Sequence, residues 1–210
     1  METDPLHKHG VFFDVWSHWY RLTPFGRALA RVQKEAIRRL NLKGGELVLD
    51  LGCGPGDGMR QVGAQGAKAV GLDYSEGMLT QAKGRVVVQG RLARGDAGRL
   101  PFRDGAFDRI VCTNSFHHYP ERLSSLKEMR RVLKKGGQLV LVDPRKDSVF
   151  GRAAIELVEK RVFGLAEVGT YTLEEWRQLC RDAGFAASNI APGPIWWPVA
   201  RAEVFVEAWA

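Results

Sequence analysis

The sequence has little cysteine, and it lacks a long hydrophobic run. Cys53, Cys112 and Cys180 are the only cysteines among 210 residues. Their odd number and wide separation argue against a disulfide framework and against a zinc ribbon. No apolar run approaches the roughly 18 residues of a membrane-spanning helix, so we expect no transmembrane segment. The chain starts with polar and acidic residues, unlike a signal peptide, and we therefore expect a cytoplasmic location.

The sequence also lacks a block of like charges and any nucleic-acid-binding signature, although its formal net charge is +7. A nucleic-acid partner is therefore not expected. One basic stripe does follow helical spacing, at Arg27, Arg31, Lys34 and Arg38. It is either a solvated helix face or a patch for an anionic lipid surface or an acidic substrate. Hydrophobic content of 45% and charged content of 26% are ordinary for one globular domain.

An apolar run at 47–51 ends in alternating glycines, and this stretch carries the first functional signal. The pattern predicts a buried strand followed by a loop whose backbone approaches a ligand, since glycine has no Cβ to hold the ligand away. A second apolar run ends at Asp73, 17 residues after Gly56. In nucleoside-binding α/β folds an acid at the end of the second strand takes the ribose hydroxyls. The loop and Asp73 therefore predict half of a nucleoside site.

The loop lacks the third glycine of the dinucleotide pattern G-x-G-x-x-G, because Asp57 stands in that position after Gly52 and Gly54. The phosphate-cradling pattern G-x-x-x-x-G-K-[ST] is absent as well. An acid at the start of the following helix favours capping that helix over receiving an anion. A nucleoside without phosphates fits better, and S-adenosylmethionine is the common one.

Periodicity and turn signals predict strands that alternate with helices, which is typical of a parallel sheet. Residues 85–89 are ambiguous: their β-branched content favours a strand, but we place them in a helix that starts near residue 76. Residues 11–25 are rich in aromatic rings, which either form a lid over the site or pack in the core. The expected strands are 46–51, 68–72, 91–94, 107–113, 138–143, 185–191 and 201–208. The expected helices are a short one that begins near residue 57 and longer ones at about 25–41, 76–89, 121–134, 148–166 and 173–183. Ser75 and Thr172 are the expected caps of the helices at 76–89 and 173–183, and Gly136 and Gly137 are expected to stop the helix at 121–134.

Several short pieces, in order and at plausible spacing, give the stretch from 47 to 143 a family resemblance. It resembles the core of a class I S-adenosylmethionine-dependent methyltransferase, and is similar to the small-molecule branch with the ubiquinone/menaquinone-type C-methyltransferases. The resemblance implies an α/β fold with a doubly wound, mostly parallel seven-stranded sheet, helices on both faces and a final antiparallel strand. The matching pieces are VLDLGCGPG (48–56), GLDYSEGML (71–79), GDA (95–97), LPF (100–102), FD (107–108), FHH (116–118) and RVLKKGG (131–137).

The resemblance also implies a role for each matching residue. Asp50, Gly52, Cys53 and Gly54 would hold the methionine part of the cofactor, and Asp73 the ribose. Tyr74 and Met78 would flank the adenine, Asp96 and Ala97 would meet its amine, and Thr113 and Asn114 would lie beneath the methionine end, with Tyr20 in the same site. From the residues alone, the alternative is a helix-capping acid for Asp50 and a turn former for Asp96, and for Cys53 a small loop filler is favoured over a nucleophile.

Methyl transfer from a sulfonium to give S-adenosylhomocysteine needs a general base only when the acceptor must lose a proton. His117 is the best-placed candidate, and His118 and Tyr20 are weaker ones; the alternative for His117 is a wall of the methionine pocket. His7, His9 and His18 lack the spacing of metal ligands, so we expect no metal.

We therefore expect a methyltransferase that acts by direct in-line displacement on a small or lipid-like acceptor. Residues 1–45 would form a helical and aromatic cover, and 46–210 the S-adenosylmethionine-binding domain. Peripheral contact with a membrane is compatible with the basic stripe and the aromatic segment. Two alternatives remain: an RNA methyltransferase, and a non-catalytic module that binds the nucleoside. The sequence leaves the oligomeric state and the acceptor open.

Overall fold

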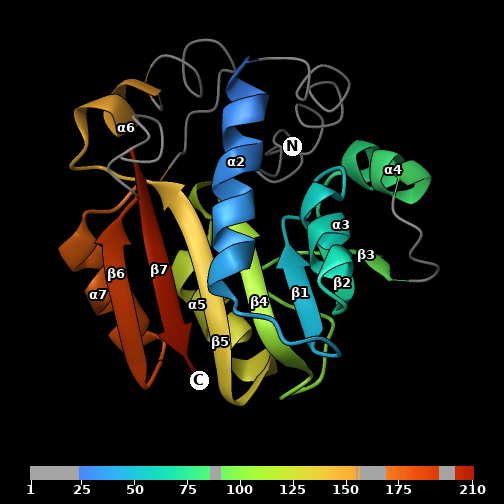
Figure 1. Cartoon of the computed structure of the whole chain (residues 1–210). Coiled ribbons are helices and arrows are strands. Elements are labelled where there is room, and N and C mark those ends of the chain that lie inside the picture. Colours follow the sequence, from blue (N-terminus) through green and yellow to red (C-terminus); the bar gives the residue numbers. More distant parts are fainter. Residues whose placement is uncertain (1–23, 86–90, 155, 157–168, 194–201) are drawn as a thin grey trace, which may run out of the picture.

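The computed structural model describes residues 24–85, 91–154, 156, 169–193 and 202–210. Within them, one seven-stranded sheet has the strand order β3-β2-β1-β4-β5-β7-β6. Every pairing among the first five strands is parallel, and β7 runs antiparallel to both of its neighbours. Figure 1 shows that β1, β4 and β5 point to the same end of the molecule. The predicted doubly wound, mostly parallel α/β sheet is confirmed.

The elements have the following bounds. The strands are β1 (Leu47–Leu51), β2 (Lys68–Asp73), β3 (Leu92–Arg94), β4 (Phe107–Thr113), β5 (Leu133–Pro144), β6 (Ala187–Pro192) and β7 (Glu203–Trp209). The helices are α2 (Pro24–Arg39), α3 (Asp57–Ala64), α4 (Glu76–Arg85), α5 (Arg122–Val132), α6 (Val149–Ala154) and α7 (Leu173–Asp182), with a short 3-10 turn, η2 (Phe116–His118).

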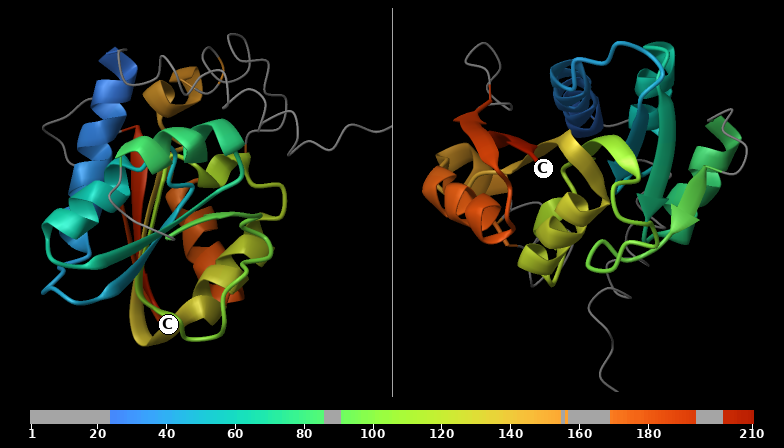
Figure 2. Two further views of the ribbon diagram at one scale, coloured as in Figure 1. Left: turned by 90° about the vertical axis from the view of Figure 1, so that its right-hand side faces the viewer. Right: turned by 90° about the horizontal axis from the view of Figure 1, so that it is seen from below.

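Helices cover both faces of the sheet, with α2 and α3 on one side and α5 and α7 on the other (Figure 2). The alternation of side chains along β5 explains the two layers of core. Val140 and Val142 belong to the cluster beneath α2, whereas Leu139 and Leu141 belong to the cluster on the opposite face, which also holds Trp176 of α7. Because successive strand residues point to opposite faces, one central apolar strand serves both layers.

One predicted boundary is wrong. We expected a helix as far as residue 134, stopped by Gly136 and Gly137, and a strand that starts at 138. In the structure α5 ends at Val132 and β5 begins at Leu133, which pairs with Phe107 of β4. The two glycines instead exchange hydrogen bonds with the backbone of Ala210. Tertiary pairing with β4 and the carboxyl-terminal end overrides the helical pattern, because Leu133 is buried on the sheet.

Other local predictions agree with the structure. Ser75 caps α4 by accepting a hydrogen bond from Met78 N at 3.1 Å. Thr172 forms a capping box with Glu175 at the start of α7. The strand at 91–94 is present as β3. Residues 86–90, most of the helix expected at 148–166 and the aromatic segment 11–23 lie outside the described residues.

Candidate functional site

The loop between β1 and α3 is built on three glycines with left-handed backbone angles. Gly52, Gly54 and Gly56 have φ values of 69°, 50° and 82°, a region that favours glycine. Position 52 also requires glycine for steric reasons, because a Cβ there would overlap Ser115. Gly56 is the N-cap of α3 and Asp57 lies in its first turn, without a capping side chain. The expectation that Asp57 caps the helix is therefore wrong, although an acid in the first turn still opposes anion binding.

Asp73 ties this loop to the end of β2. Its Oδ2 accepts a hydrogen bond from Gly54 N at 2.8 Å, and its Oδ1 accepts one from Ser75 N at 2.9 Å. The side chain is half-buried. Each oxygen of an ionised carboxylate accepts more than one hydrogen bond, so this arrangement is compatible with further bonds from two ribose hydroxyls. The loop amide and the acid thus position each other.

Asp50, near the end of β1, is a buried carboxyl group in an apolar setting. It is fully buried, and neither of its side-chain oxygens has a hydrogen-bond partner of normal geometry in the described structure. Burial, followed by the charge of Asp73, raises the pKa of Asp50 to about 7; the nearby amide of Met59 offsets part of this rise. A Cβ on Gly58 would overlap Asp50 Oδ2, so the start of α3 lies directly against the carboxyl group.

These features fit S-adenosylmethionine. A buried carboxylate without a partner is costly, and the ammonium of an amino-acid end would supply the missing partner. The glycines leave the loop open to close approach by a ligand. Asp50 also lies against the first turn of α3, where the backbone amide of Met59 lowers its pKa, so the helix-capping role considered from the sequence is compatible with this position. The site therefore has the donor and acceptor set that the amino-acid and ribose parts of such a nucleoside require.

The residues expected around the adenine follow the ends of β2 and β3. Met78 and Ala97 are buried, and Tyr74 is half-buried. Asp96 Oδ1 accepts a hydrogen bond from Gly98 N at 2.8 Å. The turn-forming role considered for Asp96 is therefore present, and a carboxylate in such a turn still has acceptor capacity for an amine.

At the end of β4, Thr113 is bonded to Gln33, a residue of α2 that the sequence analysis did not name. Asn114 follows the strand with a φ of 51°, and its N–H donates to Val142 O at 2.8 Å. Thr113 Oγ1 accepts a hydrogen bond from Gln33 Nε2 at 3.2 Å, and Gln33 Oε1 accepts one from Gln61 Nε2 at 3.4 Å. Gln33 lies on α2, 80 residues from Thr113, and no sequence signal distinguishes it from any other polar helix residue.

His117 belongs to a buried group of charges beside this end of the sheet. Its Nδ1 lies 2.7 Å from Asp143 Oδ1, and both side chains are almost fully buried. Burial raises the pKa of Asp143, and the neighbouring imidazole opposes that rise. Burial, followed by the charge of Asp143, raises the pKa of Glu203 to about 8. Arg122 Nη2 donates to the backbone oxygen of His117 at 3.3 Å.

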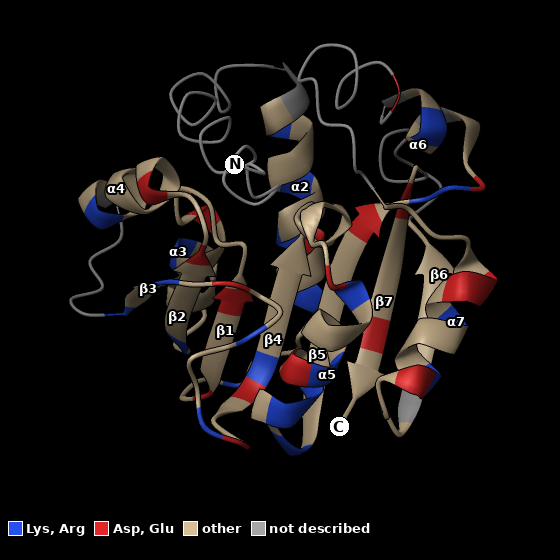
Figure 3. Cartoon of the chain, turned by 180° about the vertical axis from the view of Figure 1, so that it is seen from behind, with Lys and Arg blue, Asp and Glu red and all other residues tan. Residues whose placement is uncertain are grey.

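Sequence reasoning named His117 but not its partner. Asp143 was expected only as the end of a strand, and Glu203 fell inside a weak strand pattern. The signal for Asp143 was its place at the carboxyl end of the fifth strand, where ligands bind in such sheets. Figure 3 shows acidic segments at the neighbouring ends of β5 and β7. Nothing local marks Glu203, because only the antiparallel pairing of β5 with β7 brings it there.

The cysteines lie in the core. Cys53, Cys112 and Cys180 are free and buried. Burial, followed by the charge of Asp73, raises the pKa of the Cys53 thiol well above its usual value. A thiol that stays protonated is a poor nucleophile, so Cys53 acts as the small loop filler considered from the sequence.

All described residues expected in the site lie at the carboxyl edge of the parallel strands, whereas Tyr20 lies outside the described residues. The four basic side chains of the stripe are exposed on α2. No described helix is both long and apolar enough to cross a membrane. Across the described ranges, no three His, Cys, Asp or Glu side chains gather as a metal site would require.

Comparison with known proteins identifies the family to which a chain with this site belongs. Residues 49–141 match a family model described as a methyltransferase domain. The demethylmenaquinone methyltransferase of Geobacillus stearothermophilus is 34% identical over 154 residues, which cover 68% of this chain but only 65% of that protein. The demethylmenaquinone methyltransferase of Bacillus subtilis is 30% identical over 183 residues, which cover 81% of this chain and 78% of that protein.

A solved structure extends the likeness to nearly the whole chain. An S-adenosylmethionine-dependent methyltransferase from Thermotoga maritima superposes with a TM-score of 0.78 at 22% identity, covering 98% of this chain and 99% of that one. At such identity the likeness shows the fold, whereas the B. subtilis relative shows the family. This chain belongs to the class I S-adenosylmethionine-dependent methyltransferases, in the branch that methylates small molecules, and its methyl donor is S-adenosylmethionine.

Proposed function

We propose that the acceptor is a lipid-like quinol of the demethylmenaquinone type, methylated after it loses a proton to His117. The relatives named as demethylmenaquinone methyltransferases support the acceptor class. The observation that carries the mechanism is the buried pair of His117 and Asp143, joined at 2.7 Å beside the strand ends. A phenol-like acceptor becomes a stronger nucleophile when its hydroxyl is deprotonated, which is the case that calls for a base.

The cofactor supplies a methyl group already activated on a sulfonium. Alignment of the acceptor with that methyl group therefore provides most of the acceleration, and well-oriented reactants can gain roughly 7–11 kcal/mol. We assign the amino-acid end to Asp50 and the glycine loop, the ribose to Asp73, and the adenine to the side chains that follow β2 and β3. The residues assigned to cofactor binding are Asp50, Gly52, Cys53, Gly54, Asp73, Tyr74, Met78, Asp96, Ala97, Thr113, Asn114 and Tyr20.

In the proposed mechanism, Asp143 determines which nitrogen of the His117 imidazole accepts the proton. With the imidazole proton on Nδ1 and donated to Asp143 Oδ1, Nε2 carries the lone pair that accepts the acceptor's proton. The O–H bond of the acceptor breaks as the Nε2–H bond forms, and the resulting imidazolium is stabilised by the Asp143 carboxylate. Asp143 is thus a positioning residue, and His117 is the proposed catalytic one.

We propose two further features of the whole chain. Residues 1–45 act as a cover over a domain formed by 46–210, which is supported by the contact of α2 with the site through Gln33. The protein acts in the cytoplasm, at most in peripheral contact with a membrane, and takes no nucleic acid. The free, buried cysteines and the small-molecule relatives support this proposal. No observation favours the RNA methyltransferase or the non-catalytic module.

The first test is calorimetric titration with S-adenosylmethionine, wild type beside Asp73→Ala. Saturable binding by the wild type and loss of binding in the variant are expected, because the variant removes the ribose acceptor and frees the loop amide. Label transfer from S-adenosylmethionine to a reduced short-chain demethylmenaquinone then tests the acceptor. His117→Ala should reduce transfer by about 10²–10⁴-fold at unchanged cofactor affinity.

Two outcomes would contradict the proposal. Transfer to total RNA that falls steeply with added salt would identify a nucleic-acid acceptor instead. Equal transfer by wild type and His117→Ala at every pH would remove the base from the mechanism. Asp143→Asn offers a finer readout: it should lower the turnover number and shift its pH profile, whereas a merely structural change would leave the profile's shape intact.

A further inference from the structure

Gln33 brings a polar side chain of α2 close to the start of α3. Helix α2 runs across the sheet beside α3 (Figure 1). Gly58, in the first turn of α3, shows how close the two side chains lie. A Cβ added to this glycine would be 2.9 Å from Gln33 Nε2 and would overlap Asp50 Oδ2. The carboxamide of Gln33 and the carboxylate of Asp50 therefore both lie beside Gly58, at the start of α3.

The two side chains are chemically complementary to an amino-acid zwitterion. Asp50 is a buried carboxylate with no hydrogen-bond partner of normal geometry, suited to accept from an ammonium group. Gln33 has two amide donors on Nε2, and the bond to Thr113 Oγ1 accounts for one. The second donor suits a carboxylate. An α-amino acid carries both groups on one carbon, so one ligand end satisfies both side chains.

The attachment of α2 to the sheet does not depend on Gln33. The helix buries Val32, Ala36, Ile37 and Leu40 in the core. Its carboxyl-terminal end is held by Arg39, whose side chain reaches Glu207 on β7 at 3.1 Å. Gln33 adds bonds of 3.2 Å to Thr113 and 3.4 Å from Gln61 to these contacts. A polar residue that is not needed for packing is available for a ligand.

We propose that Gln33 is a cofactor-binding residue that donates a hydrogen bond to the carboxylate of the methionine end, while Asp50 accepts from its ammonium. This inference rests on the cofactor assigned under the proposed function. It gives α2 a direct part in recognising the amino-acid portion of the cofactor, beyond covering the site.

The test compares two ligands that differ only at that end. S-adenosylhomocysteine carries the amino-acid group, and 5′-methylthioadenosine keeps the nucleoside and the thioether without it. Gln33→Ala should weaken S-adenosylhomocysteine by about tenfold, the loss expected for one hydrogen bond to a charged group, and leave 5′-methylthioadenosine unchanged. Gln33→Glu should weaken the binding of S-adenosylhomocysteine further, because it places the new side-chain carboxylate next to the carboxylate of the ligand. Lys34→Ala, the exposed neighbour on α2, is the matched control and should change neither affinity.

Retained binding of 5′-methylthioadenosine also shows that each variant is folded. Equal weakening of both ligands, or no weakening of S-adenosylhomocysteine, would overturn the role of Gln33. Such a result leaves the proposed function standing as long as the wild type binds S-adenosylmethionine. If the wild type binds neither S-adenosylmethionine nor S-adenosylhomocysteine, the proposed function fails first and this inference with it.

Discussion

At the scale of single residues, the site concentrates buried acids whose protons are held unusually tightly. Asp50 and Glu203 have pKa values raised to about 7 and about 8, in each case chiefly by burial. Buried carboxyl groups are expensive when ionised and unpaired. Such groups concentrate at functional sites, and both lie at the edge of the sheet where the parallel strands end. Their cost to the ligand-free protein therefore depends on pH.

Asp50→Asn should make the free energy of unfolding of the ligand-free protein less dependent on pH. The folded-state pKa of Asp50, about 7, is raised above the ordinary value of 3.8 for an aspartate. The folded state then binds more protons than the unfolded state between these values, so this group's contribution to stability falls as pH rises and is gone above about pH 7. Between about pH 5.5 and pH 8, the free energy of unfolding of the wild type should fall relative to Asp50→Asn by about 2 kcal/mol.

Urea unfolding at the two pH values measures this difference. The comparison with the variant cancels the contribution of Glu203, which titrates in both proteins. Parallel pH profiles for wild type and variant would show that Asp50 does not titrate in this range. In the wild type, added S-adenosylhomocysteine should offset the loss at the higher pH, because its ammonium favours the ionised carboxylate.

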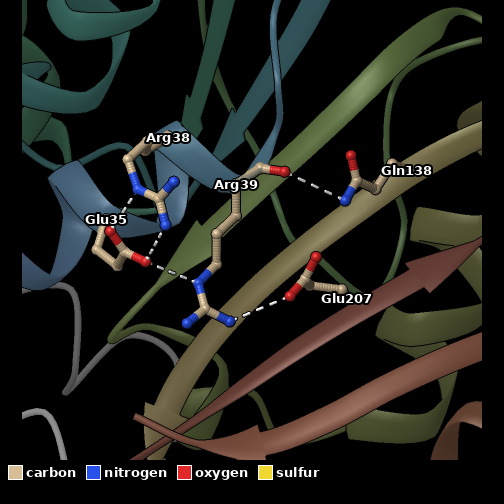
Figure 4. A network of polar contacts seen from close by, with 5 residues as sticks. All are labelled: Glu35, Arg38, Arg39, Gln138 and Glu207. Atoms are coloured by element: carbon tan, nitrogen blue, oxygen red, sulfur yellow. Dashed lines mark hydrogen bonds and ion pairs between the residues drawn. The ribbon is translucent and has the colours of Figure 1, made fainter. Parts of the chain in front are cut away.

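At the scale of elements, α2 is fixed to the sheet by one arginine rather than by its whole basic face. The Arg39 guanidinium contacts two carboxylates, with Nε 3.0 Å from Glu35 Oε1 and Nη1 3.1 Å from Glu207 Oε1 (Figure 4). The backbone oxygen of Arg39 also accepts a hydrogen bond from Gln138 Nε2. The guanidinium also stands 4.2 Å from the centre of the Phe205 ring. Arg38 forms an ion pair with Glu35, and its side chain is 71% exposed. The same residue type therefore has two different roles at adjacent positions.

Arg39→Ala should lower the free energy of unfolding by about 1–2 kcal/mol, because it removes the cation beside the partly buried Glu207 and leaves Glu35 with Arg38 alone. Arg38→Ala is the matched control and should cost about 0.5 kcal/mol or less, as exposed ion pairs do. Chemical denaturation of the three proteins at one salt concentration gives both values. Equal losses in the two variants would mean that the link to Glu207 contributes nothing to docking.

At the scale of the whole molecule, the sheet is most deeply buried at its centre and least buried at the β3 edge, beside the proposed cofactor site. β4 and β5 lie between other strands and are buried over most of their length. The edge strand β3 has three residues, none of them buried, and in the sheet it pairs with β2 alone. Elements with few buried contacts open at low free energy. The edge that carries Asp96 and Ala97 is thus the part best able to adjust to a ligand.

Hydrogen exchange followed by mass spectrometry should show this gradient. Amides of β4 and β5 should exchange at least about a hundredfold more slowly than those of β3, because their exchange needs global unfolding. S-adenosylhomocysteine should slow exchange in the loop 52–56 and in β3, and it should slow exchange in β5 as well, because a ligand that binds the folded state makes global unfolding rarer. Protection of β3 equal to that of β4 without ligand would refute the gradient.

The sequence by itself determined the class of sheet, the glycine loop and Asp73. These signals are local: an apolar run, a break at glycines and an acid follow one another along the chain, and backbone chemistry gives them their meaning without any distant contact. Caps such as Ser75 and Thr172 belong to the same group, because a side chain bonds to an amide three residues away.

Only the tertiary structure decided which side chains meet across the site. Gln33 reaches Thr113 from 80 residues away, Asp143 reaches His117 from 26, and Glu203 joins them through the last strand. The start of β5 at Leu133 was decided in the same way, by pairing with β4. These contacts depend on strand order and helix docking, which are set by burial summed over the whole core, so no short stretch of sequence contains them.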